Sequence, residues 1–99
     1  MPPKPKRIVD KALLKQIKSQ PCLACRSTFM VDPAHIRSVG SGGPDTDWNV
    51  IPLSRDCHTT QHFIGWKEFF ARYPQVWNYL ETLGWYWLEG KLWNDKLTQ

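Results

Sequence analysis

The chain has 99 residues, a net charge of +4 and three cysteines. This length predicts one compact domain with a small core, since domains usually span about 100–200 residues. The chain lacks both the roughly 18-residue apolar run of a membrane span and the apolar segment of a signal peptide, so no membrane partner is expected. Three cysteines cannot all pair in disulfides, which favours a reducing compartment, by default the cytoplasm.

The positive charge is concentrated at the start of the chain. Residues 1–20 carry a net charge of +5, whereas the remaining 79 residues sum to −1. A basic arm on a nearly neutral body indicates a polyanionic partner, because Lys and Arg gain affinity by releasing counterions from phosphates. A solubilising tail is the alternative. The candidate phosphate contacts are Lys4, Lys6, Arg7, Lys11, Lys15 and Lys18.

An extended, flexible arm is expected over residues 1–7, which contain three prolines. A helix is expected from Ile8 to Ser19, because Val9, Leu13 and Ile17 recur every fourth residue. Such a helix docks through its apolar stripe and presents lysines on another face.

Short strands are expected next, at residues 28–31 and 34–36, with a turn at Asp32-Pro33 between them. The glycine-rich segment 40–44 lacks the Gly-Lys-Ser/Thr ending of a phosphate-binding loop, so we interpret it as a connector. A returning strand at 49–53 contains a proline, which places it at a sheet edge.

The second half of the chain has mainly helical spacing. One helix is expected over residues 55–64, an aromatic stripe that we interpret as core follows over 66–73, and a further helix spans 74–83. The last segment, 85–93, alternates around Glu89-Gly90 and predicts a hairpin, with a short helix as the alternative.

Three histidines indicate metal chemistry. His58 and His62 are four residues apart on the expected helix, so their imidazoles share a face and can chelate one ion. The glutamate of the HExxH motif is missing, which argues against a metalloprotease. His35 ends a strand-like segment, and Asp47 and Asn49 precede the next. Two histidines on a metal plus a separate histidine that deprotonates water form the minimum for metal-assisted hydrolysis.

Over about residues 8–70 the chain resembles the HNH, or ββα-metal, endonuclease superfamily, and it is similar to small phage and prophage HNH proteins that include recombination-associated nucleases. The motifs that carry this resemblance are Cys22-x-x-Cys25, Ala34-His35-Ile36, Asn49-x-x-x-Leu53 and Cys57-His58-x-x-x-His62. The resemblance implies an α+β fold in a single domain, 1–99. A ββα-metal (His-Me finger) core over 20–65 would follow the arm and the basic helix, and a Trp-rich helical or hairpin extension would occupy 66–99.

The resemblance also implies residue roles. His35 would be the general base that activates water, Asn49 would brace the metal loop, and His58 and His62 would ligate one divalent ion, Mg²⁺, Mn²⁺, Ni²⁺ or Zn²⁺. Asp47 matches an acidic position of the small phage relatives and is the candidate for a third ligand or for a residue that contacts a ligand. The ion would bind the scissile phosphate and stabilise the leaving 3′ oxygen.

A basic residue is expected to steady the developing charge. Arg37 is the first choice, because two residues after His35 it would lie on the same strand face, and Arg55 is the second. Ala34 stands where other HNH proteins have a metal-binding Asp or His, so Asp32 joins Asp47 as a candidate ligand.

The cysteines give a second candidate metal site. Many relatives carry two Cys-x-x-Cys knuckles that bind structural zinc, but here the second reads Ser54-Arg-Asp-Cys57. Three thiolates remain, Cys22, Cys25 and Cys57, and zinc prefers a closed tetrahedral set. Structural zinc on these three is one hypothesis, and three reduced, mostly buried cysteines are the other.

The leading hypothesis is a metal-dependent DNA endonuclease of phage or prophage origin, acting in the bacterial cytoplasm in DNA recombination or processing. Its partner would be DNA, gripped by the basic arm, the first helix and Arg55, and it would act as a homodimer or within a phage DNA-processing complex. One alternative is a non-catalytic, metal-stabilised nucleic-acid-binding module. Another is a partner-docking protein that uses Trp85, Trp87 and Trp93.

Overall fold

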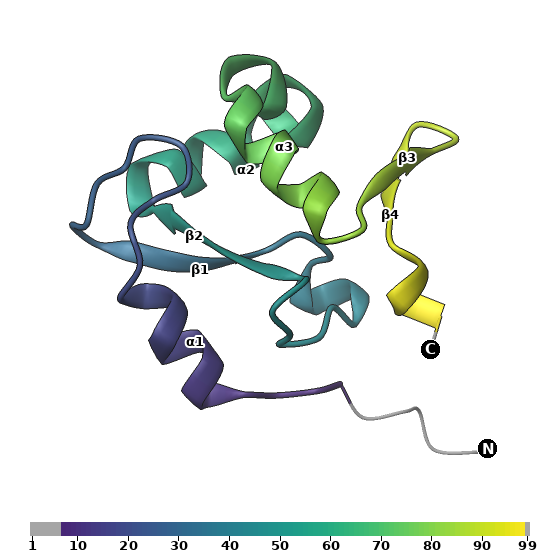
Figure 1. The fold of residues 1–99 in the computed structure, drawn as a ribbon, viewed down its shortest axis with the longest axis horizontal. Helices are drawn as coiled ribbons and strands as arrows, with labels where there is room; N and C mark the ends of the chain where they lie inside the picture. Colours follow the sequence, from purple (N-terminus) through teal and green to yellow (C-terminus); the bar gives the residue numbers. More distant parts are fainter. Residues whose placement is uncertain (1–6, 99) are drawn as a thin grey trace.

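The computed structural model describes residues 7–98, and over these residues the chain has an α+β fold, which confirms the predicted class (Figure 1). No helix in this part of the chain is long and apolar enough to cross a membrane. The elements are α1 (Lys11–Lys18), β1 (Val31–His35), a 3₁₀ turn (Val39–Ser41), β2 (Val50–Ser54), α2 (Arg55–Arg72), α3 (Pro74–Thr82), β3 (Tyr86–Leu88), β4 (Lys91–Trp93) and a second 3₁₀ turn (Asp95–Thr98).

The first helix is shorter than predicted. It begins at Lys11 because Asp10 caps it, its side chain accepting a hydrogen bond from the Leu13 N–H at 3.0 Å. Val9 precedes the helix and is exposed, whereas Ile17 is buried, so the docking stripe contains fewer residues than expected. Figure 1 shows α1 on one side of the β1–β2 sheet and α2 and α3 on the other.

Strands β1 and β2 pair antiparallel, from Val31 opposite Ser54 to His35 opposite Val50. The expected turn at Asp32-Pro33 is wrong, since β1 runs through it, and residues 28–30 are not part of the strand. Pro33 of β1 and Pro52 of β2 are tolerated because each strand of a two-stranded sheet has one unpaired edge, where the missing N–H of a proline costs no hydrogen bond to the partner strand. The carbonyl of Pro52 faces that edge, where it accepts a hydrogen bond from the Leu23 N–H at 3.0 Å.

Helix α2 contains a break at Gly65, whose φ of 84° and ψ of 164° are not helical. The break separates the two segments expected at 55–64 and 66–73. In the second segment Phe69 and Phe70 are buried, which confirms the interpretation of the aromatic stripe as core. Phe70 contacts Trp77 of α3, with ring centroids 5.0 Å apart, so the aromatic residues join the two helices.

The C-terminal segment forms a hairpin of β3 and β4, one of the two predicted alternatives. Its turn residues, Glu89 and Gly90, both have positive φ, at 51° and 80°, as a type I′ turn requires. Of the three tryptophans considered for partner docking, Trp85 is buried, Trp93 is half-buried and Trp87 is exposed.

Gly65→Ala is expected to destabilise the protein by about 1–3 kcal/mol, because its backbone conformation is essentially restricted to glycine. An added Cβ would meet no heavy atom within 4 Å, so the cost comes from the backbone and not from a clash. Urea unfolding of both proteins measures it. Gly40→Ala is the matched control, since Gly40 also has open space but no positive φ. Equal losses in both variants would contradict this explanation.

Candidate active site

The three histidines line one shallow cavity of about 170 Å³. His35 is the last residue of β1, while His58 and His62 lie one turn apart near the start of α2. The rest of the wall comes from Pro33, Ser38 and Val39. Pairing of β1 with β2, which leads directly into α2, therefore brings together residues separated by more than 20 positions in the chain.

His58 and His62 are arranged so that both can bind one ion. Their Nε2 atoms lie 3.0 Å apart, and metal–nitrogen bonds in zinc sites are about 2.0–2.1 Å long. Burial of His58 and the neighbouring His62 lower the pKa of His58, while Asp32 opposes this effect. The lowered pKa favours the neutral imidazole, which is the form that ligates metals.

Asp32 lies behind His58 and does not share its metal-facing nitrogen. Its Oδ2 is 3.5 Å from Nδ1 of His58, and its Oδ1 is 3.4 Å from the guanidinium of Arg55. A carboxylate on the second ring nitrogen is the usual way to orient a metal-binding histidine. The geometry thus fits an orienting role for Asp32 better than the role of a ligand.

Asp47, the expected third ligand, is exposed in the turn that precedes β2. Within the described residues, the carboxylates that contact histidines are those of Asp32 and Asp45. The assignment of Asp47 stays a prediction without a supporting contact.

Asp45, which the sequence interpretation missed, is the acidic residue that contacts His35. Its side chain is 1% exposed, and its Oδ1 lies 2.7 Å from Nε2 of His35 and 2.6 Å from the guanidinium of Arg7. The other oxygen, Oδ2, accepts a hydrogen bond from the Asp10 N–H at 3.0 Å. The carboxylate therefore joins the start of the chain to the end of β1.

These contacts determine the charge of Asp45. Burial alone would raise its pKa, but the hydrogen bonds from His35, from the Asp10 N–H and from Arg7 lower it to about 2. An ionised carboxylate only accepts hydrogen bonds, so Nε2 of His35 carries the hydrogen in this contact. In the neutral ring, Nδ1 is then the basic nitrogen that can accept a proton from water.

Asn49 is fully buried and braces the connector between the strands. Its Oδ1 accepts from the Arg37 N–H at 2.8 Å, and its Nδ2 donates to the carbonyls of Pro44 at 2.8 Å and Arg37 at 3.2 Å. These three bonds hold the backbone on both sides of the connector that separates His35 from Asp45. Its role in a metal loop stays a prediction.

The two basic candidates have different surroundings. Because β1 ends at His35, Arg37 lies beyond the strand and does not share a strand face with His35, as the sequence interpretation had assumed. Its guanidinium lies 5.9 Å from the centre of the Trp93 ring. Arg55, the second choice, is linked to His58 through Asp32 and is the arginine connected to the histidine pair.

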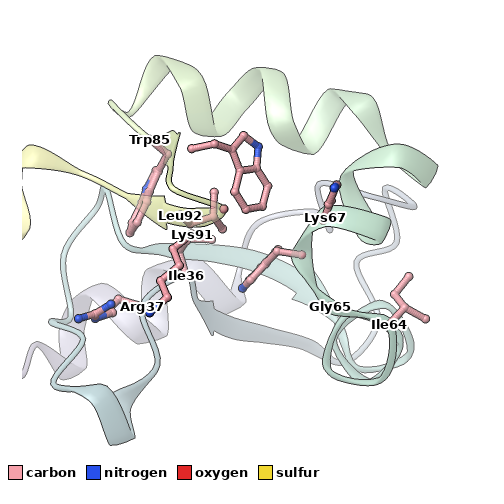
Figure 2. A pocket seen from close by; sticks show the side chains of 11 residues that line it. Ile36, Arg37, Ile64, Gly65, Lys67, Trp85, Lys91 and Leu92 are labelled. Carbon is pink, nitrogen blue, oxygen red and sulfur yellow. The ribbon is translucent and has the colours of Figure 1, made fainter.

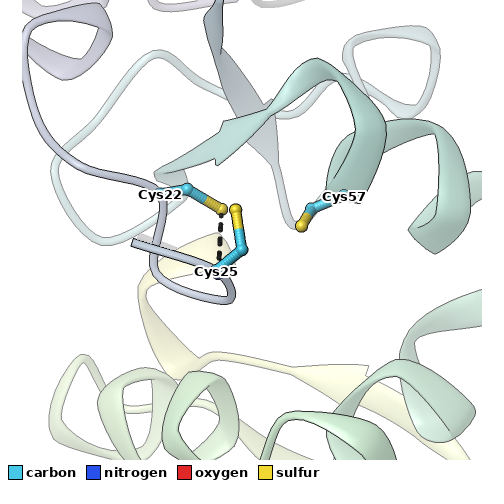
Figure 3. A group of neighbouring side chains, drawn as sticks. All are labelled: Cys22, Cys25 and Cys57. Carbon is cyan, nitrogen blue, oxygen red and sulfur yellow. Dashed lines mark hydrogen bonds between the residues drawn. The ribbon is translucent and has the colours of Figure 1, made fainter. Parts of the chain in front are cut away.

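The cysteines form a separate cluster that could hold a metal ion. Sγ atoms of Cys22, Cys25 and Cys57 all lie within 4.8 Å of one another, two from the loop before β1 and one from the first turn of α2 (Figure 3). Cys22 and Cys57 are buried, whereas Cys25 is exposed. Ser54 stands beside them, with its hydroxyl 3.4 Å from Sγ of Cys25.

The pKa values of the buried thiols differ. Burial opposes ionisation of Cys22, but hydrogen bonds from the backbone of Cys25, Ser54 and Ala24 lower its pKa to about 7. Burial raises the pKa of Cys57 to about 12, and the neighbouring cysteines add to this rise. A thiolate at Cys22 is the form that binds metal, and a bound cation would favour ionisation of the other two.

The basic residues of the first part of the chain fall into two groups. Arg7 belongs to the body and not to a free arm, since it also donates to the Gly43 carbonyl at 3.1 Å. Lys11, Lys15 and Lys18 are exposed along α1. The predicted arm over residues 1–6, with Lys4 and Lys6, lies outside the described residues.

Asp45→Asn is expected to lower the stability at neutral pH by roughly 2 kcal/mol, since one pKa unit corresponds to about 1.36 kcal/mol. The folded-state pKa of Asp45 is below its ordinary value of 3.8, so this stability is present above pH 3.8 and is lost as the pH falls toward about 2. Urea unfolding across this range should give a flatter pH profile for the variant. Asp47→Asn, at an exposed neighbour, should keep the wild-type profile, and a shared profile of Asp45→Asn and wild type would contradict the argument.

Comparison with known proteins gives one match. No curated protein and no solved structure matches the chain. Residues 1–83 match a family described as "Protein of unknown function (DUF968)", and this range includes the three histidines, Asp45 and the three cysteines. The match extends over most of the chain, and the protein therefore belongs to the DUF968 family.

Proposed function

We propose that this protein is a metal-dependent DNA endonuclease that hydrolyses phosphodiester bonds in the cavity lined by its three histidines. The observation that carries the proposal is that two of the histidines lie together while the third is held apart from them. His58 and His62 have their Nε2 atoms 3.0 Å apart, as two ligands of one ion would, whereas His35 is held separately by a buried carboxylate. Two antiparallel strands followed directly by a helix also agree with a ββα-metal core.

In this mechanism His35 is the general base. Asp45 holds its Nε2–H, so Nδ1 takes a proton from water as the water oxygen attacks phosphorus. The P–O3′ bond then breaks with its electron pair on the 3′ oxygen, which takes a proton from solvent water, and Asp45 stabilises the imidazolium that has formed. A divalent ion held by His58 and His62 would supply positive charge to the scissile phosphate and the leaving 3′ oxygen. Arg55 is the preferred side chain for the remaining phosphate charge, with Arg37 as the other candidate.

Binding of DNA would depend on phosphate contacts. Lys11, Lys15 and Lys18 are exposed on α1, and such contacts position a duplex without reading its sequence. A phage or prophage origin, a role in recombination or DNA processing and action as a homodimer or in a larger complex complete the proposal. These points rest on the resemblance to small HNH nucleases.

Wild-type protein with Mg²⁺, Mn²⁺, Ni²⁺ or Zn²⁺ is expected to nick supercoiled plasmid DNA. His35→Ala should lower the nicking rate by about 10²–10⁴-fold, the usual contribution of a general base. His58→Ala should abolish the stimulation by metal, because one of the two proposed ligands is removed. Gel separation of nicked and supercoiled forms over time measures both effects.

Asn78→Ala, at an exposed position of α3, is the control for purification and should nick like wild type. Equal nicking by wild type and His35→Ala would indicate a contaminating nuclease. If folded protein binds DNA but does not nick the plasmid with any of the four metals, the catalytic proposal is refuted.

The cysteine cluster favours the second candidate function, a metal-stabilised nucleic-acid-binding module without catalysis. A metal held by Cys22, Cys25 and Cys57 would tie the loop before β1 to the first turn of α2. In such a module the metal serves folding, since metal-binding energy is folding energy in small domains. Zinc is the proposed ion because it prefers thiolates in a tetrahedral set.

Purified protein is expected to retain zinc, and Cys22→Ser and Cys57→Ser should lose it together with a large part of their thermal stability. Metal analysis and thermal unfolding measure the two quantities. His58→Ala should keep the zinc and the fold if the two sites are separate. Unfolding of His58→Ala combined with inactive wild type would instead favour a binding module whose structural metal is held by the histidines. Wild type that is stable without zinc would rule out the structural site on the cysteines.

A further inference from the structure

A second cavity, of about 420 Å³, lies between the break in α2 and the C-terminal hairpin (Figure 2). None of the histidines lines it. Its volume falls within the roughly 300–1,000 Å³ typical of ligand sites. The side chains that characterise it are the aromatic residues Trp66, Trp85 and Trp87 and the basic residues Arg37, Lys67 and Lys91.

The indole rings of this cavity are supported from behind. Trp87 is 40% exposed, and its ring stacks on Trp77 with centroids 5.9 Å apart. Trp66 stacks on Phe70 with centroids 5.5 Å apart. Trp85 is fixed by a hydrogen bond from its Nε1 to the Trp48 carbonyl. Trp85 is buried and belongs to the support, whereas the rings of Trp66 and Trp87 are at least partly exposed. These two rings offer flat surfaces at little entropic cost to a planar aromatic ligand.

The charge of the cavity wall is positive. Arg37, Lys67 and Lys91 come from three different parts of the chain, the segment after β1, the helix α2 and the strand β4. Among the residues that the structure describes, no Asp or Glu lines the cavity and none forms a salt bridge with these three. The guanidinium of Arg37 lies over Trp93, outside the lining, so Lys67 and Lys91 are the cations without such a contact. The wall therefore combines aromatic surfaces with positive charge, and a planar ring attached to phosphates satisfies both.

This cavity is connected to the histidine site through Arg37. Arg37 follows His35 by two residues, and its backbone N–H and carbonyl are both bonded to Asn49. Ile36 and Ile64 of this cavity also lie within two residues of His35 and His62, so the same two segments line both cavities. We propose that the cavity binds an unpaired nucleotide of a DNA strand, its base against Trp66 and Trp87 and its phosphate against the basic residues. The inference rests on the proposed nuclease function and specifies its substrate as DNA with a single-stranded region.

The nucleotide must be unpaired for a physical reason. Bases inside a duplex have both faces covered by neighbouring bases, and their edges are paired. A base has a free face only in single strands, loops, strand ends or flipped nucleotides. There, stacking on an aromatic side chain compensates for the lost stacking on neighbouring bases.

The test is binding of a fluorescent short oligothymidylate, and of a blunt duplex, by wild type without added divalent metal, measured by fluorescence anisotropy. Trp87→Ala and the double variant Lys67→Glu/Lys91→Glu should each weaken binding of the oligothymidylate by about tenfold or more, the loss typical of one base-stacking or phosphate contact. Affinity for the duplex should stay near that of wild type. Both lysines are exposed, so the double variant keeps the test valid if Trp87→Ala fails to fold.

Arg72→Glu, an exposed charge reversal on the same helix but outside the cavity, is the matched control and should bind oligothymidylate like wild type. Wild-type affinity in both cavity variants, or equal losses for oligothymidylate and duplex, would overturn the inference. The binding assay involves no cleavage. If the plasmid is never nicked but the cavity variants lose affinity for oligothymidylate, the nuclease proposal is refuted and the cavity proposal stands. If wild type nicks the plasmid but the cavity variants bind oligothymidylate like wild type, the cavity proposal is refuted and the nuclease proposal stands.

Discussion

The buried carboxylate of Asp45 is the interaction on which the candidate site depends. A buried charge costs several kcal/mol unless it is paired and hydrogen-bonded, so the chain must bring its partners to this point. They are Arg7, the backbone N–H of Asp10 and His35, which come from the start of the chain and from the end of β1. The same contacts that stabilise the charge fix the tautomer of His35 and anchor the residues that precede α1. The carboxylate that anchors the N-terminal segment therefore also orients the proposed base.

The first turn of α2 connects the two candidate metal sites. Cys57 and His58 are adjacent in the chain, yet one faces the cysteine cluster and the other the histidine cavity, because successive helical residues point about 100° apart. Ser54 caps this turn, its hydroxyl accepting from the Cys57 N–H at 3.4 Å. An ion on the thiolates would thus hold the turn that presents His58 and His62. The cluster would serve the chemistry by fixing the helix and need not contact the substrate.

Local spacing predicted much of this arrangement, and non-local pairing decided the rest. The spacing of four residues between His58 and His62 depends only on the helix, and the break at Gly65 and the turn at Glu89-Gly90 likewise follow from local backbone preferences. The Asp32-Pro33 turn failed because its signal is local, whereas pairing with β2, about 20 residues away, holds that segment extended. Asp45 was missed for the same reason, since its role depends on a contact with Arg7, which lies 38 residues earlier in the chain. Its position, just after the glycine-rich connector and four residues before Asn49, is the one signal in the sequence that pointed to it.

Selectivity is the remaining physical question for the proposed nuclease. Lysines on α1 would attract any phosphate backbone, and a cavity of about 170 Å³ would enclose little more than the reacting phosphate. Neither feature can distinguish one DNA from another. The cavity of about 420 Å³ would differ, because a base can stack on its aromatic rings only after it has left the duplex stack. If the proposal holds, the protein would discriminate by DNA structure and not by sequence, and it would need no recognition helix in the groove.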